Sequence, residues 1–207
     1  MSNGQELLEL SPVVPVVVVD DAADAAPVAR ALLAGGIRVI ELTLRTPAAL
    51  EAIEQVASAV PGIVIGAGTV TTPEQAKQAT DAGAKFLVTP GCTDRLLEAV
   101  SGTGLPFLPG AGTVSEAMRL AEQGLTAMKF FPAEPSGGVA FLKAIAGPLP
   151  RLRFCPTGGI TVGSAPSYLA LPTVGCVGGS WLTPKDALAA KDFDRITALA
   201  KEAAALG

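Results

Sequence analysis

The sequence contains no histidine. Imidazole is the usual base beside a serine or cysteine nucleophile and the commonest metal ligand in proteins. Its absence therefore excludes Ser-His and Cys-His nucleophile pairs and zinc sites that depend on histidine. Any proton transfer must use carboxylates, lysine, cysteine or the chain's one tyrosine.

Cysteine and aromatic residues are also scarce. The three cysteines, Cys92, Cys155 and Cys176, are odd in number and lack metal-ligand spacing. Cys155 and Cys176 lie in apolar segments, which predicts buried, inert thiols. Aromatics make up only 4% of a chain that is 49% hydrophobic, so the core must be mainly Ala, Val, Leu and Ile. With 207 residues, we expect 1–207 to form a single domain with a full core.

Charged residues are few, at 16% of the chain, and the net charge is −4 with both signs interspersed. No basic patch favours nucleic-acid binding. The longest apolar run, from Val13 to Val19, is far too short to cross a bilayer, and the N-terminus lacks the pattern of a secretory leader. We therefore expect a soluble cytoplasmic protein with no nucleic-acid or membrane partner.

Eight short apolar runs alternate with Ala-rich segments of helical pattern. The runs begin at Val13, Val39, Ile63, Phe86, Phe107, Ala127, Arg153 and Val174. Their starts are about 20 to 26 residues apart, the length of one strand-plus-helix unit. The runs are apolar nearly throughout, as in parallel strands covered by helices. They predict an α/β fold, a single (β/α)₈ TIM barrel; an open doubly wound sheet is the main alternative.

The helix ends carry signals of their own. Thr46-Pro47, Thr72-Pro73 and Thr113-Val114 indicate helix starts, with an early proline or a following acid. Glycine marks four helix ends, at Gly35–Gly36, Gly83, Gly104 and Gly124. We also expect a short extra helix within Asn3–Leu10, over the bottom of the barrel, and a final helix within Asp192–Ala205.

Lys129 stands out among the residues at the C-terminal ends of the predicted strands, where such barrels hold their reactive groups. It lies inside the apolar run AMKFFP. Desolvation favours the neutral amine, which is the form that condenses with a ketone. A strand-end lysine that reaches solvent or binds an anion is the alternative interpretation.

Glu41 interrupts the apolar run VIELTL in the same way. Taken alone, it could belong to a structural ion pair. A buried acid and a buried amine in one barrel, however, compensate each other's charge, and paired titrating groups are what acid–base chemistry requires. Glu41 and Lys129 together therefore predict a catalytic pair.

Polar and glycine residues follow other strands. Arg45 and Thr69 end two successive strands and could clamp a carboxylate, although solvation or helix capping would also explain them. Gly158–Gly159 and Gly178-Gly179-Ser180 follow strands seven and eight. Because glycine has no side chain, the backbone N–H groups of these residues can reach a phosphate, which such barrels usually bind after strands seven and eight. Ordinary tight turns are the alternative.

Six motifs in this order resemble one family: VIELTLRT, GAGTV, FLVTPG, KFFPAE, RFCPTGGI and GGSWL. The family is the 2-keto-3-deoxy-6-phosphogluconate (KDPG) aldolases, whose relatives cleave 4-hydroxy-2-oxoglutarate. The resemblance runs from about Val13 to the last helix. It implies a homotrimeric (β/α)₈ barrel that needs no metal or cofactor. It also implies cleavage of a phosphorylated keto acid to pyruvate and glyceraldehyde 3-phosphate, as in the Entner–Doudoroff pathway.

The resemblance assigns roles to individual residues. Lys129 matches the Schiff-base lysine and Glu41 the general acid/base, while Arg45 and Thr69 match the residues that hold the substrate carboxylate. The other matched positions are the pocket walls and the phosphate site: Pro90, Phe131, Gly158, Gly159, Gly179 and Ser180.

One loop departs from the family pattern. PGAGTVSE follows the fifth strand, where the pattern has a bulkier residue and a serine before TVSE. We expect this loop to alter the pocket mouth and with it the aldehyde preference. Three alternatives stay open: the same chemistry on 4-hydroxy-2-oxoglutarate or an epimeric keto acid, a phosphosugar-binding barrel without turnover, and a metal-dependent barrel epimerase, which the lack of histidine disfavours.

Overall fold

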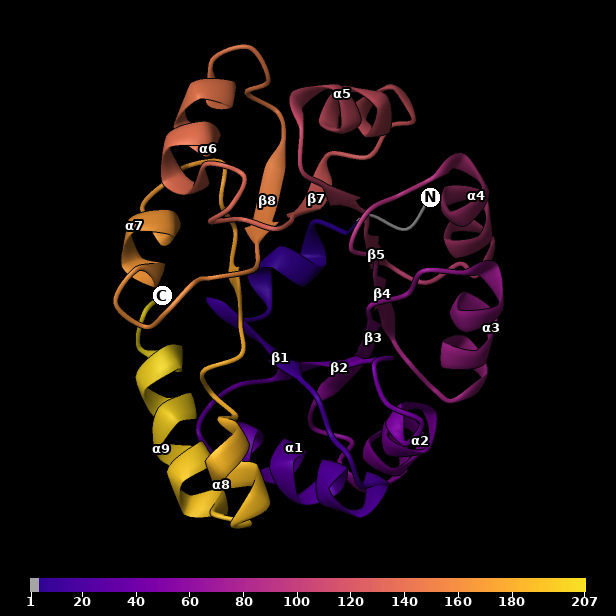
Figure 1. Ribbon diagram of the computed structural model, residues 1–207, viewed down its shortest axis with the longest axis vertical. Coiled ribbons are helices and arrows are strands. Elements are labelled where there is room, and N and C mark those ends of the chain that lie inside the picture. Colours follow the sequence, from indigo (N-terminus) through magenta and orange to yellow (C-terminus); the bar gives the residue numbers. More distant parts are fainter. Residues whose placement is uncertain (1–3) are drawn as a thin grey trace.

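The computed structural model describes residues 4–207, and Figure 1 shows strands in its interior surrounded by helices. The strands are β1 (Val13–Val17), β2 (Val39–Thr43), β3 (Val64–Gly68), β4 (Phe86–Val88), β5 (Phe107–Leu108), β6 (Gly110–Ala111), β7 (Ala127–Phe130), β8 (Arg153–Pro156) and β9 (Val177–Gly179). The α-helices are α1 (Ala25–Ala34), α2 (Ala49–Ala59), α3 (Pro73–Asp81), α4 (Asp94–Gly102), α5 (Val114–Glu122), α6 (Gly138–Ala146), α7 (Ala165–Leu169), α8 (Lys185–Ala189) and α9 (Phe193–Ala204). Two 3₁₀ helices are η1 (Glu6–Glu9) and η2 (Ala22–Asp24).

The described strands form two parallel sheets, in the orders β5-β4-β3-β2-β1-β9 and β6-β7-β8. The sheets meet at two seams. At the first, Pro109 separates β5, which pairs with β4, from β6, which pairs with β7. At the second, the isolated bridges Phe154↔Val174 and Thr157↔Gly178 link β8 to the segment of β9. The result is a mixed α/β fold whose parallel strands curl around a common interior.

The predicted apolar runs all contain strands, with two differences in detail. The fifth run holds two short strands instead of one, because proline at position 109 has no N–H for the ladder. The strand of the eighth run begins at Val177 rather than at Val174, which makes only an isolated bridge. These differences shorten strands without changing their order along the chain.

The helix signals are mostly confirmed. Thr72 and Thr113 each cap a helix and form a capping box with Gln75 and Glu116. Helix α2 follows Thr46-Pro47 as predicted, but it begins at Ala49 without a side-chain cap, and the Thr46 hydroxyl donates to the Val19 carbonyl at 2.6 Å. Positive φ angles are found at four of the predicted helix-end glycines, Gly36, Gly83, Gly104 and Gly124.

The segment before β1 packs against the strands. Within the predicted helical segment Asn3–Leu10, the four-residue helix η1 is present, while Asn3 lies outside the described residues. Leu8 is buried, and the Gln5 side-chain amide donates to the Thr126 hydroxyl at 2.9 Å. At the other end of the chain, α9 lies within the predicted final helix, but the short α8 before it was not predicted.

Small residues let the elements approach closely. Gly66 leaves room for the buried ring of Phe86, which lies where a side chain at position 66 would be. Gly35, at the end of α1, does the same for Ala200 on α9. Such contacts explain how a core with few aromatics reaches dense packing. Within residues 4–207, no helix combines the length and the apolar character needed to span a membrane.

The contact between α1 and α9 can be tested with Gly35→Ala. The added methyl group would collide with Ala200, so we expect a loss of about 1–3 kcal/mol in the free energy of unfolding. Gly102→Ala is the matched control, because no neighbouring atom lies within 4 Å of a Cβ there, and it should change stability by about 1 kcal/mol or less. Urea unfolding measures both, and equal effects would contradict this packing.

Candidate active site

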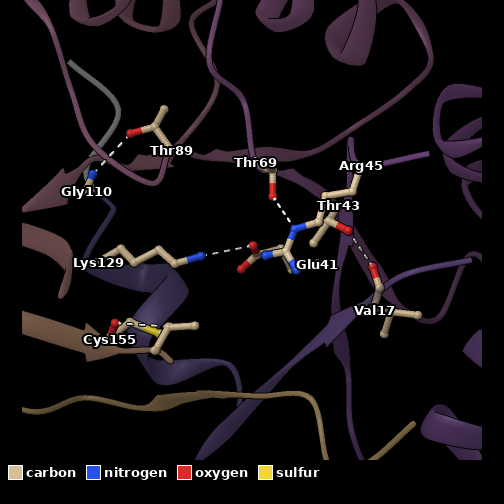
Figure 2. Close-up of polar contacts among 10 residues, drawn as sticks. Val17, Glu41, Thr43, Arg45, Thr69, Thr89, Gly110, Lys129 and Cys155 are labelled. Carbon is tan, nitrogen blue, oxygen red and sulfur yellow. Dashed lines mark hydrogen bonds and ion pairs between the residues drawn. The ribbon is translucent and has the colours of Figure 1, made fainter. Parts of the chain in front are cut away.

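A buried contact between Lys129 and Glu41 lies at the centre of the strands. The Lys129 ammonium nitrogen Nζ is 3.2 Å from Oε1 of Glu41, and the two side chains are only 4% and 3% exposed. Figure 2 shows the lysine of β7 reaching toward the carboxylate of β2. The two residues are far apart in sequence and come from different sheets, so the fold brings the predicted pair together.

The neighbouring strands make room for this contact. Glu41 pairs in register with Val16 and Gly66, and its carboxylate lies over Gly68 of β3, where any larger side chain would collide with it. Lys129 pairs in register with Gly110 and Cys155. Gly68 thus leaves space for the Glu41 carboxylate, whereas Gly110, beside Lys129, leaves space for the backbone of Pro90.

The contact places a carboxylate and an amine where each can compensate the charge of the other. A single buried charge is costly, whereas an acid and an amine within hydrogen-bond distance compensate each other. A proton can pass from the amine to the carboxylate across this contact, which leaves a neutral amine able to attack a carbonyl carbon. The Lys129 nitrogen also lies 5.5 Å from the centroid of the Phe131 ring, within the range of a cation–π contact.

Arg45 and Thr69 also come together, as predicted. The Nε of Arg45 donates to the Thr69 hydroxyl at 3.2 Å, and the two residues directly follow β2 and β3 (Figure 2). Within residues 4–207, no carboxylate lies within 4.0 Å of the Arg45 guanidinium in an ion pair. This exposed cation is therefore available to an anion from solution.

The two glycine-rich loops lie side by side. The bridge between Thr157 and Gly178 joins the ends of β8 and β9, and Gly178 leaves room for the Thr157 hydroxyl. Gly158 and Gly159 both have positive φ angles, 105° and 84°. Only glycine adopts such angles without strain, so this turn depends on glycine at both positions.

The remaining predicted residues surround these groups. Phe131 is half-buried, and its ring would be 3.3 Å from a Cβ placed on Gly158. Pro90 is half-buried, and its carbonyl lies against Gly110. Ser180 is exposed, just after β9, and Gly179 is covered by the ring of Trp181.

Two buried threonines at strand ends, to which sequence reasoning gave no role, also belong to the site. The Thr43 hydroxyl donates to the Val17 carbonyl at 3.1 Å, and the Thr89 hydroxyl accepts from the Gly110 N–H at 3.0 Å (Figure 2). The Thr43 bond holds β1 beside the strand of Glu41, and the Thr89 bond holds β6 beside the strand of Lys129. Their signal in the sequence was a polar residue inside or just after an apolar run, the same signal that identified Glu41.

The cysteines differ in their surroundings. Cys155 and Cys176 are buried, as predicted. Cys92 is only partly buried, and burial raises the pKa of its thiol to about 11. In the described part of the chain, no group of three His, Cys, Asp or Glu residues is placed to hold a metal ion.

Comparison with known proteins gives the family. The model of the family described as KDPG and KHG aldolase matches residues 5–199. The 2-dehydro-3-deoxy-phosphogluconate aldolase of Dickeya dadantii is 53% identical, covering 99% of this chain and 96% of that protein. The KHG/KDPG aldolase of Escherichia coli K12 is 52% identical over 98% of this chain and 95% of its own length. The chain belongs to the KDPG and KHG aldolase family.

Solved structures agree with this assignment. A KDPG aldolase from Legionella pneumophila, with pyruvate captured at low pH as a covalent carbinolamine intermediate, has a TM-score of 0.95 to this chain. It is 44% identical and each chain covers 98% of the other. The Zymomonas mobilis ZM4 enzyme with 3-phosphoglycerate has a TM-score of 0.94 at 48% identity, covering 99% of this chain and 96% of its own.

Proposed function

We propose that this protein is a class I aldolase that cleaves 2-keto-3-deoxy-6-phosphogluconate to pyruvate and glyceraldehyde 3-phosphate through a Schiff base on Lys129. The observation that carries the proposal is the buried 3.2 Å contact between Lys129 and Glu41 in a chain of this family. The covalent carbinolamine of pyruvate in the Legionella pneumophila relative supports the same chemistry. The reaction fits a role in the Entner–Doudoroff pathway.

Formation of the Schiff base begins with a neutral amine. Glu41 takes a proton from Lys129, and the Lys129 nitrogen attacks the C2 ketone of the substrate. The resulting carbinolamine loses its hydroxyl as water, with the proton supplied by Glu41. The product is an iminium ion, which withdraws electrons from the neighbouring carbon atoms.

Cleavage uses the same carboxylate. Glu41, directly or through a water molecule, removes the proton of the C4 hydroxyl. The C4–O bond becomes the carbonyl of glyceraldehyde 3-phosphate, and the electrons of the broken C3–C4 bond move into the iminium to give an enamine. Protonation of the enamine at C3 and hydrolysis of the iminium release pyruvate and the free lysine. One carboxylate can act at each step because its proton donor or acceptor changes.

The substrate ends are held by the groups around the pair. Arg45 and Thr69, joined by their hydrogen bond, bind the substrate carboxylate. Pro90 and Phe131 form walls of the pocket. The backbone of the two glycine-rich loops binds the phosphate: Gly158, Gly159, Gly179 and Ser180.

The architecture and assembly are part of this proposal. We infer that the two sheets, linked at Pro109 and by the β8–β9 bridges, form one closed (β/α)₈ barrel in a single catalytic domain, 1–207. The short η1 is its extra N-terminal helix. A cytoplasmic homotrimer that needs no metal or cofactor stays a prediction from the resemblance.

A second substrate has specific support. The Escherichia coli relative is named as both a KHG and a KDPG aldolase. Cleavage of 4-hydroxy-2-oxoglutarate would use the same lysine and carboxylate but leave the phosphate loops empty. Coupled assays of pyruvate release from the two substrates, run side by side, rank them and test turnover itself.

The Schiff base can be trapped directly. Borohydride added in the presence of pyruvate should reduce the iminium and leave one stable mass label on Lys129, because this lysine is buried against the proposed base. Peptide mass spectrometry locates the label. Labelling at Lys85 or Lys143 instead would reject the assignment of the nucleophile.

Glu41→Gln tests the proton transfers. Glutamine keeps the shape and an acceptor oxygen but cannot exchange protons, so kcat should fall by about 10²–10⁴-fold while substrate still binds. Exchange of the pyruvate methyl protons with deuterium should fall with it. Glu54→Gln, on the exposed face of α2, is the matched control and should be neutral. A folded Glu41→Gln enzyme that exchanges these protons at the parent rate would show that Glu41 is only a charge partner.

Ser180→Asp tests the phosphate site. A carboxylate placed against a bound phosphate is repelled at short range, so KM for the phosphorylated substrate should rise by roughly tenfold or more. KM for 4-hydroxy-2-oxoglutarate should change little. Ser58→Asp adds the same charge in the last turn of α2 and should alter neither. Equal increases for both substrates would place the phosphate elsewhere.

A further inference from the structure

A hydrogen bond beside the glycine-rich loops has no role in the chemistry described above. The only tyrosine of the chain, Tyr168 on α7, is fully buried, and its hydroxyl donates to Oε1 of Glu134 at 2.7 Å. Burial raises the pKa of Tyr168 well above its ordinary value, and the hydrogen bond to Glu134 acts in the same direction. The phenol therefore stays protonated and keeps donating across the working pH range.

Glu134 is attached to the loop that follows β8. Its backbone N–H donates to the Gly158 carbonyl at 3.0 Å. Its side chain lies directly over Gly159, since a Cβ added there would be 2.8 Å from the Cβ of Glu134 and 2.7 Å from its Cγ. The neighbouring Ala133 N–H donates to the Thr157 carbonyl at 2.8 Å. Glu134 thus contacts both glycines of the proposed phosphate loop.

The start of α6 leaves space for this contact. Gly138 has a φ of 55°, and a Cβ there would be 2.8 Å from the Tyr168 hydroxyl. Its N–H donates to the Ala133 carbonyl at 2.9 Å, which closes the turn that carries Glu134. A larger residue would separate the phenol from the carboxylate. The local sequence therefore keeps Tyr168, Glu134 and the loop in contact.

A carboxylate is an unexpected choice for this position. An aliphatic side chain would pack over Gly159 equally well, and a negative charge close to a phosphate site is unfavourable. The carboxylate accepts the buried phenol, and a hydrogen bond to a charged acceptor is stronger than a neutral one. The pair therefore fixes where the Glu134 side chain lies, and with it the backbone of the loop.

We propose that Glu134 and Tyr168 are positioning residues that hold the Gly158–Gly159 backbone in the conformation that binds the substrate phosphate. The proposal rests on the proposed function, which places the phosphate at this loop. Neither residue takes part in proton transfer. Their effect should be confined to the phosphate end of the substrate and leave the reaction at Lys129 unchanged.

Tyr168→Phe tests this, because it removes the hydroxyl and keeps the buried ring. KM for the phosphorylated substrate should rise by about tenfold, the size of one lost hydrogen bond to a charged group, with kcat near the parent value. KM for 4-hydroxy-2-oxoglutarate should stay within about twofold. A purely structural bond would change neither KM selectively.

Two variants of Glu134 separate its charge from its position. Glu134→Gln retains an oxygen that can accept the phenol, so KM for the phosphorylated substrate should stay near the parent value or fall. Glu134→Ala removes the acceptor and should reproduce Tyr168→Phe. If Tyr168→Phe does not fold, Glu134→Ala carries the test, since residue 134 is exposed.

Thr197→Val is the matched control for loss of one hydrogen bond between helices. The Thr197 hydroxyl of α9 donates to the Ala31 carbonyl of α1 at 3.1 Å, away from the loops. Thermal unfolding of each variant measures its loss of stability. Thr197→Val should lower stability without changing either KM, which shows that destabilisation alone does not alter phosphate binding.

The outcomes distinguish this proposal from the function on which it rests. Equal changes of KM for both substrates in Tyr168→Phe and Glu134→Ala, or no change in either, overturn the positioning role. If Ser180→Asp discriminates between the substrates in the same assay, the phosphate site stands and only this proposal fails. If Ser180→Asp does not discriminate either, the phosphate site itself is wrong.

Discussion

An apolar interior can hold two opposite charges only if they stay together, and this constraint governs the structure around Lys129 and Glu41. Removing one partner would leave the other as an uncompensated buried charge, at a cost of about 3–5 kcal/mol. The two side chains approach from β7 and β2, so the sheets must face each other at a fixed separation. Gly68 keeps the space for the carboxylate open. Packing and chemistry therefore depend on the same few positions.

Features that depend on neighbouring residues in the sequence could be predicted. The strands follow from apolar runs, and the ends of helices follow from glycines and from threonines such as Thr72 and Thr113. The Lys129–Glu41 pair could be predicted because a charged residue inside an apolar run has few explanations. The hydrogen bond between Arg45 and Thr69 also agrees with the sequence. Each of these residues could be identified from its own short segment, and the strand order then brings the partners together.

Features that depend on competition between distant groups could not be predicted. The Thr46 hydroxyl bonds to the Val19 carbonyl instead of capping α2, because the fold brings that acceptor within reach. The break at Pro109 is filled by the Thr89 hydroxyl, which accepts from the N–H of Gly110. The hydrogen bond of Tyr168 with Glu134 joins a helix to a loop 34 residues away, and no local sequence pattern predicts it. Such partners become visible only when the chain is folded.

The two seams between the sheets have a consequence for the mechanics of the molecule. Glu41, Arg45 and Thr69 belong to the larger sheet or directly follow its strands, whereas Lys129 and Gly158 belong to or follow the smaller one. A substrate that contacts residues of both sheets links the two sheets to each other. The free energy of binding then also resists separation of the sheets, and this effect grows with the logarithm of the ratio of ligand concentration to Kd. Amide exchange near Pro109 and the β8–β9 bridges would therefore slow most when the site is filled.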